Sequence, residues 1–313
     1  MTFENINKGY RGVFQPGRLT LGLISPMDHY AVGDLPAMEQ SLERIRLAEQ
    51  AGFAAVWLRD IPFNVPNFGD VGQMFDPLTY LGFLAAQTQT IALGVGSLIL
   101  PLRHPAHIAK AAATVDQLSG GRLLLGVASG DRPDEFPAMG YPHATRGHGF
   151  RECFEYIRRM AESYPAFENS LGRLAGDIDM LPKPTAAKVP MLITGGSQQP
   201  MAWGATHSDG LITYPRGAQQ QAQIIEDWRS QIPTEQRHSK PIMQSLYIDL
   251  QDRADAPPEP IHLGFRSGAN FLNEYLQSLQ AIGVNHVSIN LRFNRAPIEE
   301  TIEQLATQVL ENF

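Results

Sequence analysis

Two apolar runs of the chain end in small residues, where a planar ligand can lie against bare backbone. The segment 93–97 reads LGVGS, and the segment 125–131 reads LGVASGD. Glycine and serine leave the backbone open to close approach by a ligand, whereas larger side chains cover it. The region from 75 to 140 therefore has the composition of a cofactor site.

A third apolar run, at 191–193, leads into Thr194-Gly195-Gly196-Ser197. If these residues turn into the start of a helix, the backbone N–H groups there are unpaired and carry positive partial charge. A phosphate can dock at such a turn, with the Ser197 hydroxyl as an additional donor. The alternative is a tight turn in which Ser197 is a simple N-cap.

Other kinds of reactive site receive little support. His104 and His107 form a close pair, but they lack the spacing of an HExxH motif, so no metal is expected. Cys153 lies beside an apolar helical stripe, which predicts a core thiol rather than a nucleophile. The chain has no GxSxG motif of a hydrolase, and the glycines at 94–96 lack the third glycine of a dinucleotide fingerprint.

The elements that position these residues alternate between strand and helix. Eight short apolar runs predict buried strands, at 21–24, 54–58, 91–95, 123–127, 191–193, 211–212, 243–250 and 287–289. Stripes of apolar residues at helical spacing separate most of these runs. This alternation predicts an α/β fold, a (β/α)8 TIM barrel, with a doubly wound open sheet as the main alternative.

The whole chain, 1–313, is expected to form this one barrel domain. The first helix after strand one is expected to begin near Asp34 and to end at Gly52. Residues 165–189 contain three prolines and no helical stripe, which predicts a loop or hairpin inserted between helix 4 and strand 5. Residues 251–264 predict a proline-containing linker after strand seven. Each segment either covers the mouth of the barrel or is a plain surface excursion.

Composition and charge limit the possible partners. The chain has a formal net charge of −7 and no run of five like charges, so neither nucleic acid nor an anionic membrane is expected as a partner. The amino-terminal residues lack the apolar region of a signal peptide, and no apolar run approaches about 18 residues. A cytoplasmic location is therefore expected, and a single cysteine fits a reducing compartment.

Four stretches together resemble the bacterial luciferase-like flavin monooxygenases, a family that includes coenzyme-F420-dependent relatives. They read AEQAGFAAVWLRD at 48–60, DPLTYLGFLAAQTQTIALGVGSLILPLRHP at 76–105, VDQLSGGRLLLGVASG at 115–130 and ITGGSQQPMAWGATHSDGLI at 193–212. The resemblance implies a barrel with an insertion, a reduced flavin or deazaflavin at the strand ends, and a homodimer. It also implies a cis peptide bond between Gly96 and Ser97, beneath the ring of the cofactor.

The resemblance further implies which residues contact the cofactor. They follow the first five strands: Met27, Asp60, Gly96, Ser97, Ser129, Gly130, Gly195, Gly196 and Ser197. The phosphate is expected at the loops after strands four and five. A general expectation for barrels, a phosphate site after strands seven and eight, is set aside on the strength of the resemblance.

The chain departs from the luciferase catalytic subunit at two positions. That subunit has an arginine after strand four and a histidine after strand two, where this chain has Ser129 and Ile61. Light emission from a long-chain aldehyde is therefore not expected. Other residues at the rim become the candidates for acid–base chemistry: Asp60, His29, His104 and Arg132. Two alternatives stay open, that His104 caps or faces solvent at a helix start and that Asp60 simply pairs with Arg59.

The function predicted on this resemblance is that of an FMN monooxygenase, which uses reduced flavin and O2 on a small organic substrate. A separate flavin reductase is the expected source of the reduced flavin. One alternative is an F420-dependent oxidoreductase, for which Arg103, Arg132 and Arg216 offer a basic rim. The other is a flavin-binding barrel without turnover. The substrate cannot be named, because variable loops build its pocket.

Overall fold

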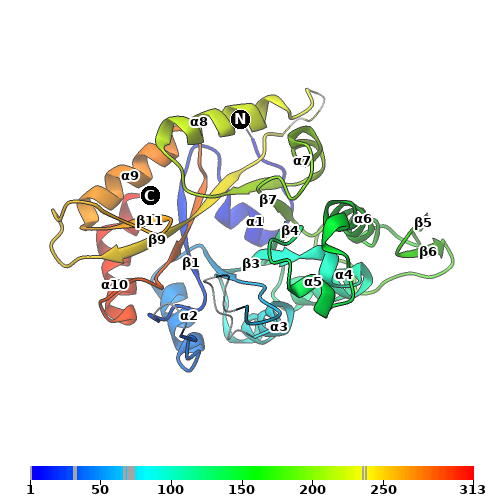
Figure 1. Ribbon diagram of the computed structural model, residues 1–313, viewed down its shortest axis with the longest axis horizontal. Helices are drawn as coiled ribbons and strands as arrows, with labels where there is room; N and C mark the ends of the chain where they lie inside the picture. Colours follow the sequence, from blue (N-terminus) through cyan, green and yellow to red (C-terminus); the bar gives the residue numbers. More distant parts are fainter. Residues whose placement is uncertain (1, 31–33, 66–67, 69–74, 235, 237) are drawn as a thin grey trace.

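Eight parallel strands close into a barrel in the computed structural model, which describes residues 2–30, 34–65, 68, 75–234, 236 and 238–313 (Figure 1). The strands are β1 Thr20–Ile24, β2 Ala55–Leu58, β3 Ala92–Ile99, β4 Leu123–Ala128, β7 Met191–Thr194, β8 Gly210–Thr213, β9 Ile242–Leu250 and β12 His286–Asn290. β1 pairs with β2 on one side and with β12 on the other, so the ring closes. The predicted (β/α)8 barrel is confirmed, and the open sheet is excluded.

Helices between the strands form the outer layer (Figure 1). They are α2 Ser41–Gln50, α3 Pro77–Gln87, α4 Pro105–Leu118, α6 Arg146–Arg159, α7 Met201–His207, α8 Ala218–Ser230, α9 Ala269–Ala281 and α10 Ile298–Gln308. Local chemistry sets several of their ends. At the start of α3, Asp76 Oδ1 accepts a hydrogen bond from Thr79 N at 2.9 Å. After α4, Gly120 adopts a φ of 65°, a conformation that stops a helix and favours glycine.

The start of α2 differs from the prediction. The helix begins at Ser41 and not near Asp34, because Met38 has a φ of 61°, which a right-handed helix cannot contain. The Met38 N–H donates to Asp28 Oδ2 at 3.1 Å. A side chain that follows β1 therefore holds this connection in a turn, and Asp34 does not cap the helix.

The two segments beyond a minimal barrel both contain strands. In the segment 165–189, β5 Ala166–Asn169 and β6 Gly172–Ala175 pair as an antiparallel hairpin, which extends away from the barrel (Figure 1). The predicted insertion is thus a hairpin, and Phe167 packs edge-on against Tyr156 of α6. The segment 251–264 is more than a linker. It includes β10 Glu259–Ile261, which pairs with β11 Gly264–Ser267, and β11 continues the sheet beside β9.

The amino end of the barrel is closed by a helix that the sequence analysis did not predict, α1 Lys8–Val13. Its buried side chains, Tyr10 and Val13, pack with Phe14 against the barrel interior, and Figure 1 shows α1 amid the ring of strands. Burial of each such apolar side chain is worth about 1.5–3 kcal/mol. A Cβ on Gly9 would lie 2.6 Å from Arg122 O, so only glycine permits this close approach.

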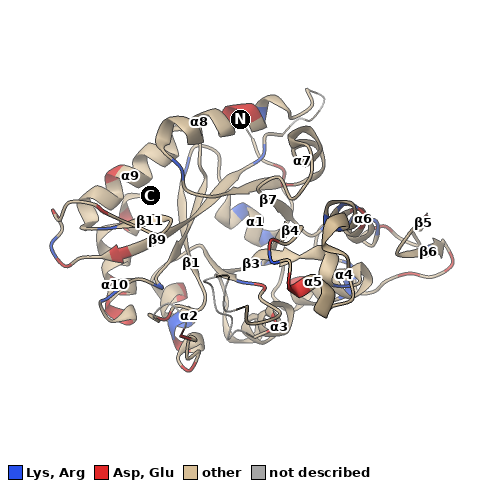
Figure 2. Cartoon of the chain, in the orientation of Figure 1, with Lys and Arg blue, Asp and Glu red and all other residues tan. Residues whose placement is uncertain are grey.

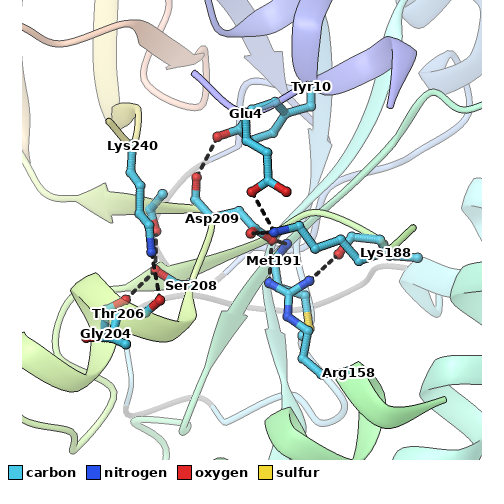
Figure 3. Close-up of polar contacts among 12 residues, drawn as sticks. Glu4, Tyr10, Arg158, Lys188, Met191, Gly204, Thr206, Ser208, Asp209 and Lys240 are labelled. Atoms are coloured by element: carbon cyan, nitrogen blue, oxygen red, sulfur yellow. Dashed lines mark hydrogen bonds and ion pairs between the residues drawn. The ribbon is translucent and has the colours of Figure 1, made fainter. Parts of the chain in front are cut away.

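A network of charged groups surrounds Asp209 at this closed end (Figure 3). The Asp209 carboxylate contacts Arg158 Nη2, Lys188 Nζ at 2.8 Å and Met191 N at 2.8 Å. Lys188 also contacts Glu4 Oε2, at 2.7 Å. Burial on its own would raise the pKa of Asp209, but Arg158 and Lys188 outweigh burial and hold the pKa below its ordinary value. Asp209 is therefore a buried but fully engaged carboxylate.

The outer surface mixes both signs of charge. Lys and Arg are interspersed with Asp and Glu along the outer helices (Figure 2). Among the residues that the structure describes, no helix is both long and apolar enough to cross a membrane.

Candidate active site

A cavity of about 950 Å³ opens at the carboxyl ends of the strands. Its walls come from all eight barrel strands or the residues that follow them, from the connection before α6 and from the β10–β11 turn. Its volume is at the upper end of the range for small-molecule and cofactor sites. The carboxyl end of the strands is also where enzymes with this fold place their active sites.

The small residues of β3 and β4 divide into two roles. A Cβ on Gly94 would lie 2.3 Å from Trp57 Cε3, and a Cβ on Gly126 would lie 2.5 Å from Ile212 Cδ1. These two glycines therefore serve packing inside the barrel. Gly96 is different, because a Cβ there would lie 3.6 Å from Trp57 Cε3, an ordinary contact distance. Gly96 lies on the cavity wall and leaves room for a ligand.

The bond between Gly96 and Ser97 is cis, as the family resemblance implied. The register of β3 against β4 shifts between Val95 and Leu98, so this part of β3 departs from the regular ladder. The Ser97 hydroxyl is hydrogen-bonded to the Thr194 hydroxyl of β7. Gly96 and Ser97 together present a narrow, nearly bare wall to the cavity.

Asp60 is buried at the cavity wall, and its carboxylate accepts three hydrogen bonds. Its Oδ2 accepts from Ile99 N at 2.8 Å and from Arg103 Nη1 at 2.6 Å, and its Oδ1 accepts from Arg103 Nη2 at 2.7 Å. The alternative prediction was that Asp60 pairs with Arg59. In the structure Asp60 instead forms a bidentate ion pair with Arg103. Burial raises the pKa of Asp60, and Arg103 opposes this effect. Asp60 fixes the end of β3 through Ile99, which is a positioning role.

One part of the cavity, the phosphate side, consists of Ser129, Gly130, His143, Arg146 and Ser197. Arg146 begins α6, and its Nε donates to Gly130 O at 3.2 Å. The buried His143 Nε2 atom has no hydrogen-bond partner among the described residues. Hydroxyl, imidazole and guanidinium groups thus belong to this part of the lining, and such groups suit a phosphate monoester.

The turn after β7 differs in detail from the prediction. α7 begins at Met201, so Ser197 is neither its N-cap nor part of its first turn. Ser197 Oγ instead donates to Thr194 O at 2.8 Å. Gly195 donates its N–H to Ile212 O, and neither Gly195 nor Gly196 is on the cavity wall. Of the predicted loop, Thr194 and Ser197 reach the wall, and the Ser197 backbone N–H donates to no described residue.

The opposite part of the cavity, the aromatic side, consists of Tyr247, His262, Ser288, Arg292 and Phe293. The Tyr247 ring centroid lies 5.7 Å from that of His262 and 5.3 Å from that of Phe293. The Arg292 guanidinium lies over the ring of Phe293 at 5.4 Å. These residues come from β9, the β10–β11 turn and the end of β12.

Besides Gly195 and Gly196, three more of the predicted site residues lie away from the cavity wall. His104 caps α4, where its Nδ1 accepts from Ala106 N, and its Nε2 contacts Leu171 O of the hairpin at 2.9 Å. His29 is exposed on the connection after β1. Met27 is buried in the hydrophobic core. None of the three lines the cavity.

The functional residues that the sequence analysis missed are His143, Arg146, Tyr247, His262 and Arg292. Arg292 follows the last strand, so the rule that active-site residues follow strand ends could have found it. His143 and Arg146 could not be found in this way, because they lie in the connection before α6, far from any strand end in sequence. The start of α6 lies beside the loop after β4, where Arg146 Nε donates to Gly130 O, and this contact brings them to the cavity.

The fold and this cavity are those of a (β/α)8 enzyme with a large open site at the carboxyl ends of its strands. The family model of the luciferase-like monooxygenases matches residues 15–268, and the chain belongs to that family. The recognition made from the four sequence stretches is thus confirmed.

Two curated relatives share parts of the chain. An uncharacterized protein of Mycobacterium tuberculosis is 32% identical over 187 residues, which are 55% of this chain and 66% of that protein. Limonene 1,2-monooxygenase of Rhodococcus erythropolis is 30% identical over 145 residues, which are 46% of this chain and 36% of that enzyme. The chain thus spans at most about two thirds of the length of these relatives.

Solved structures agree in fold over nearly the whole chain. An F420-dependent secondary alcohol dehydrogenase in complex with an F420–acetone adduct has a TM-score of 0.75 at 16% identity, covering 93% of this chain and 98% of that one. The oxygenating constituent of 3,6-diketocamphane monooxygenase from Pseudomonas putida, in complex with FMN, has a TM-score of 0.73 at 16% identity, covering 94% and 98%. At such identities the likeness establishes the fold alone.

Proposed function

We propose that this chain is a flavin-dependent monooxygenase that uses reduced FMN and O2 to oxidise a small organic substrate. The observation that carries the proposal is the continuity of the cavity. A bare wall at Gly96 and Ser97 adjoins the phosphate side at Ser129 and Arg146. A cofactor in which a planar ring is joined to a phosphate matches a bare wall that lies next to the phosphate side.

The residues of the phosphate side would hold the cofactor. Arg146 and His143 would donate to the phosphate oxygens, and the hydroxyls of Ser129 and Ser197 would add neutral donors. The backbone at Gly96 would lie against the ring. When bound, the reduced cofactor would supply the electrons and the activation of oxygen.

The protein would contribute orientation and exclusion of water more than acid–base chemistry. Asp60 has both carboxylate oxygens engaged by Arg103 and Ile99 N, so we assign it to holding the cavity wall in place. Trp57 and Ile212 line the floor of the cavity, and their packing keeps water from the barrel interior. This division of labour explains why no triad of catalytic side chains is needed.

F420 is the competing cofactor, and the cationic groups of the cavity favour it as a second candidate. Four arginines, Arg59, Arg132, Arg146 and Arg292, line the described wall, a charge that suits a cofactor with a longer anionic tail. With F420 the reaction would be hydride transfer and not oxygenation.

Equilibrium titration of the purified apoprotein with FMN and with F420 tests the proposal. We expect FMN to bind at micromolar concentration, and chemically reduced FMN on the protein to consume oxygen in a substrate-dependent manner. Binding of F420 in preference to FMN would establish the competing reaction. If neither cofactor binds at micromolar concentration, the proposed function is wrong.

We also propose a homodimer and a separate flavin reductase as partners of the enzyme. Apolar side chains on α3 and α4 support the dimer: Phe83 is 47% exposed and Leu118 is 64% exposed, beside a groove between the two helices. Light scattering during gel filtration should give a mass of about twice 34.5 kDa. Leu118→Glu should shift the measured mass toward that of the monomer.

A further inference from the structure

The two-residue turn between β10 and β11 carries a leucine in an unfavourable backbone conformation. Ile261 pairs with Gly264 across the hairpin, so His262 and Leu263 are the residues of the turn. Leu263 has a φ of 49°, in the left-handed region that glycine and asparagine usually occupy. Both turn residues line the cavity. A bulky apolar side chain thus stands at a turn position that disfavours it.

Backbone contacts hold this turn against β9, in keeping with the place of β11 beside β9 (Figure 1). Tyr247 N donates to Leu263 O at 3.2 Å. A Cβ on Gly264 would lie 1.8 Å from Tyr247 O, so only glycine permits this close approach. The turn is therefore attached to β9 through its backbone, and this attachment requires no particular side chain at position 263.

The Leu263 side chain is not fully buried by the fold, although it belongs to a cavity wall. Leu263 is 36% exposed, and Tyr214, which follows β8 on the same wall, is 43% exposed. The rings of the aromatic side adjoin the turn, with the His262 centroid 6.3 Å from that of Phe293 and 5.7 Å from that of Tyr247. Large apolar side chains exposed within a cavity are typical of a ligand site.

Backbone strain is concentrated at this cavity. In the described part of the chain, five residues other than glycine have a positive φ, and three of them, Ser197, Gln198 and Leu263, line the cavity. Such conformations persist where a functional contact offsets their cost. Ser197 and Gln198 are polar and lie by the phosphate side, whereas Leu263 is apolar and lies by the aromatic side.

We propose that Leu263 determines substrate specificity, with its side chain packing against a bulky apolar body of the substrate beside the rings of Tyr247 and Phe293. The proposal rests on the proposed function, because it takes the bare wall and the phosphate side to be the place of the cofactor. It names the substrate class for the same site: organic molecules with a bulky apolar body.

The test compares a large and a small apolar probe, 2-naphthol and phenol, by isothermal titration calorimetry on the FMN-loaded protein. We expect the wild type to bind 2-naphthol at least about tenfold more tightly than phenol, because the second ring buries further apolar surface. In Leu263→Gly, 2-naphthol should weaken at least about fivefold, whereas phenol should change less than about twofold. Leu263→Met keeps the apolar bulk and should bind 2-naphthol within about twofold of the wild type.

Unfolding midpoints separate a substrate contact from a structural role of Leu263. Glycine adopts a positive φ without steric cost, so Leu263→Gly should leave the midpoint of the apoprotein unchanged or raise it. Tyr164→Gly is the matched control, because Tyr164 has a φ of 46°, is 60% exposed and is not on the cavity wall. This control should leave the affinity for 2-naphthol unchanged.

Two outcomes would overturn the inference. One is a wild type that does not bind 2-naphthol, or that binds it no more tightly than phenol. The other is a lower midpoint in Leu263→Gly with unchanged affinity for 2-naphthol, because Leu263 would then serve the stability of the turn.

FMN titrations separate failure of this inference from failure of the proposed function. FMN binding to the apoprotein is measured first, and its absence counts against the proposed function. The 2-naphthol titrations are repeated on the apoprotein, so they report on Leu263 in either case. Leu263→Gly should bind FMN within about twofold of the wild type. Displacement of 2-naphthol by FMN would mean that the turn belongs to the cofactor site, and the inference would be wrong while the proposed function stood.

Discussion

The two ends of the barrel use charged residues in opposite ways. At the amino end, α1 closes the ring, and the carboxylate of Asp209 is engaged by Arg158, Lys188 and Met191 N (Figure 3). At the carboxyl end, a cavity of about 950 Å³ is lined by four arginines against two carboxylates within the described residues. At the amino end the buried charges pair with one another inside the fold, whereas at the carboxyl end charged side chains line an open cavity that a ligand can enter.

The difference implies that substitutions at the two ends have separate effects. Changes at the amino end should lower the free energy of unfolding and leave ligand affinity alone. Changes at the carboxyl end should do the reverse, as expected for a fold that separates stability from activity along its axis.

The largest effect on the free energy of unfolding is expected for Asp209→Asn. Removal of one partner of a buried charge pair costs about 3–5 kcal/mol in the free energy of unfolding, because Arg158 and Lys188 lose their counter-charge. Chemical denaturation should measure this loss, and FMN affinity should be unchanged. Asp255→Asn, at an exposed ion pair with Arg253, is the matched control and should cost less than about 1 kcal/mol.

The cost of Asp209→Asn should also depend on pH. The pKa of Asp209 is held below its ordinary value, so its contribution is present above the unfolded pKa, about 3.9, and is lost as the pH falls through the lower folded pKa. The difference between wild type and variant should shrink below pH 3.9. An equal difference at all pH values would contradict this account.

The second effect concerns His286, which lies inside the barrel between the two ends. Its Nε2 accepts from Trp57 Nε1 at 2.9 Å, so the proton is on Nδ1, which lies 2.8 Å from Thr20 Oγ1. Burial lowers the pKa of His286 to about 3, below the unfolded value of about 6.5. The unfolded state therefore binds more protons between these values, and stability should fall by about 1.4 kcal/mol per pH unit as the pH decreases.

Denaturation of wild type and His286→Gln from pH 7 to pH 4 measures this dependence. Carboxylates elsewhere contribute equally to both proteins, so the difference isolates His286. The difference in the free energy of unfolding between the wild type and the variant should shrink as the pH falls. Parallel curves would show that His286 does not titrate in this range.

A smaller effect is expected for Arg146→Gln at the carboxyl end. Loss of one charged hydrogen-bond donor to the phosphate should weaken FMN about tenfold, or about 1.4 kcal/mol. The unfolding midpoint in the absence of ligand should be unchanged. Equilibrium titration with FMN checks the prediction, with Arg173→Gln as the control, and riboflavin should bind both proteins equally because it lacks the phosphate.

The smallest effect is expected at Cys153, which belongs to neither end. Its side chain is buried and burial raises its pKa to about 12, so a disulfide reagent should not modify the folded protein at pH 8. Modification should follow unfolding and should therefore be faster in Asp209→Asn than in Arg146→Gln. Rapid labelling of the folded wild type, followed by absorbance, would show that the core opens locally at α6.

Local patterns were sufficient for the barrel but not for its amino end. The eight strands were predicted because each is a short apolar run between amphipathic helices. α1 was missed because its six residues carry only a partial apolar stripe and form a helix through contacts with the barrel floor. The start of α2 was wrong because Asp34 has the composition of a cap, while Met38 adopts a left-handed conformation that no local pattern predicts.

The cavity was predictable along one wall and not along the other. Gly96 and Ser97 lie in the second half of β3, and Ser129, Gly130 and Ser197 come soon after the ends of β4 and β7, so the expected strand ends located them. His262 comes from the β10–β11 turn, which had been interpreted as part of a linker. Its place depends on the pairing of β11 with β9, a contact between segments whose sequences show no sign of it.

The amino-acid sequence by itself determined the alternation of strand and helix, the family and the small residues that leave backbone bare. These properties depend on residues close together in the chain. The tertiary structure alone decided which charges are paired. Asp60 meets Arg103 and not Arg59, and Asp209 meets Arg158 and Lys188, because closure of the ring brings distant strand ends together. Coulomb energy depends on distance in space, so position along the chain does not fix it.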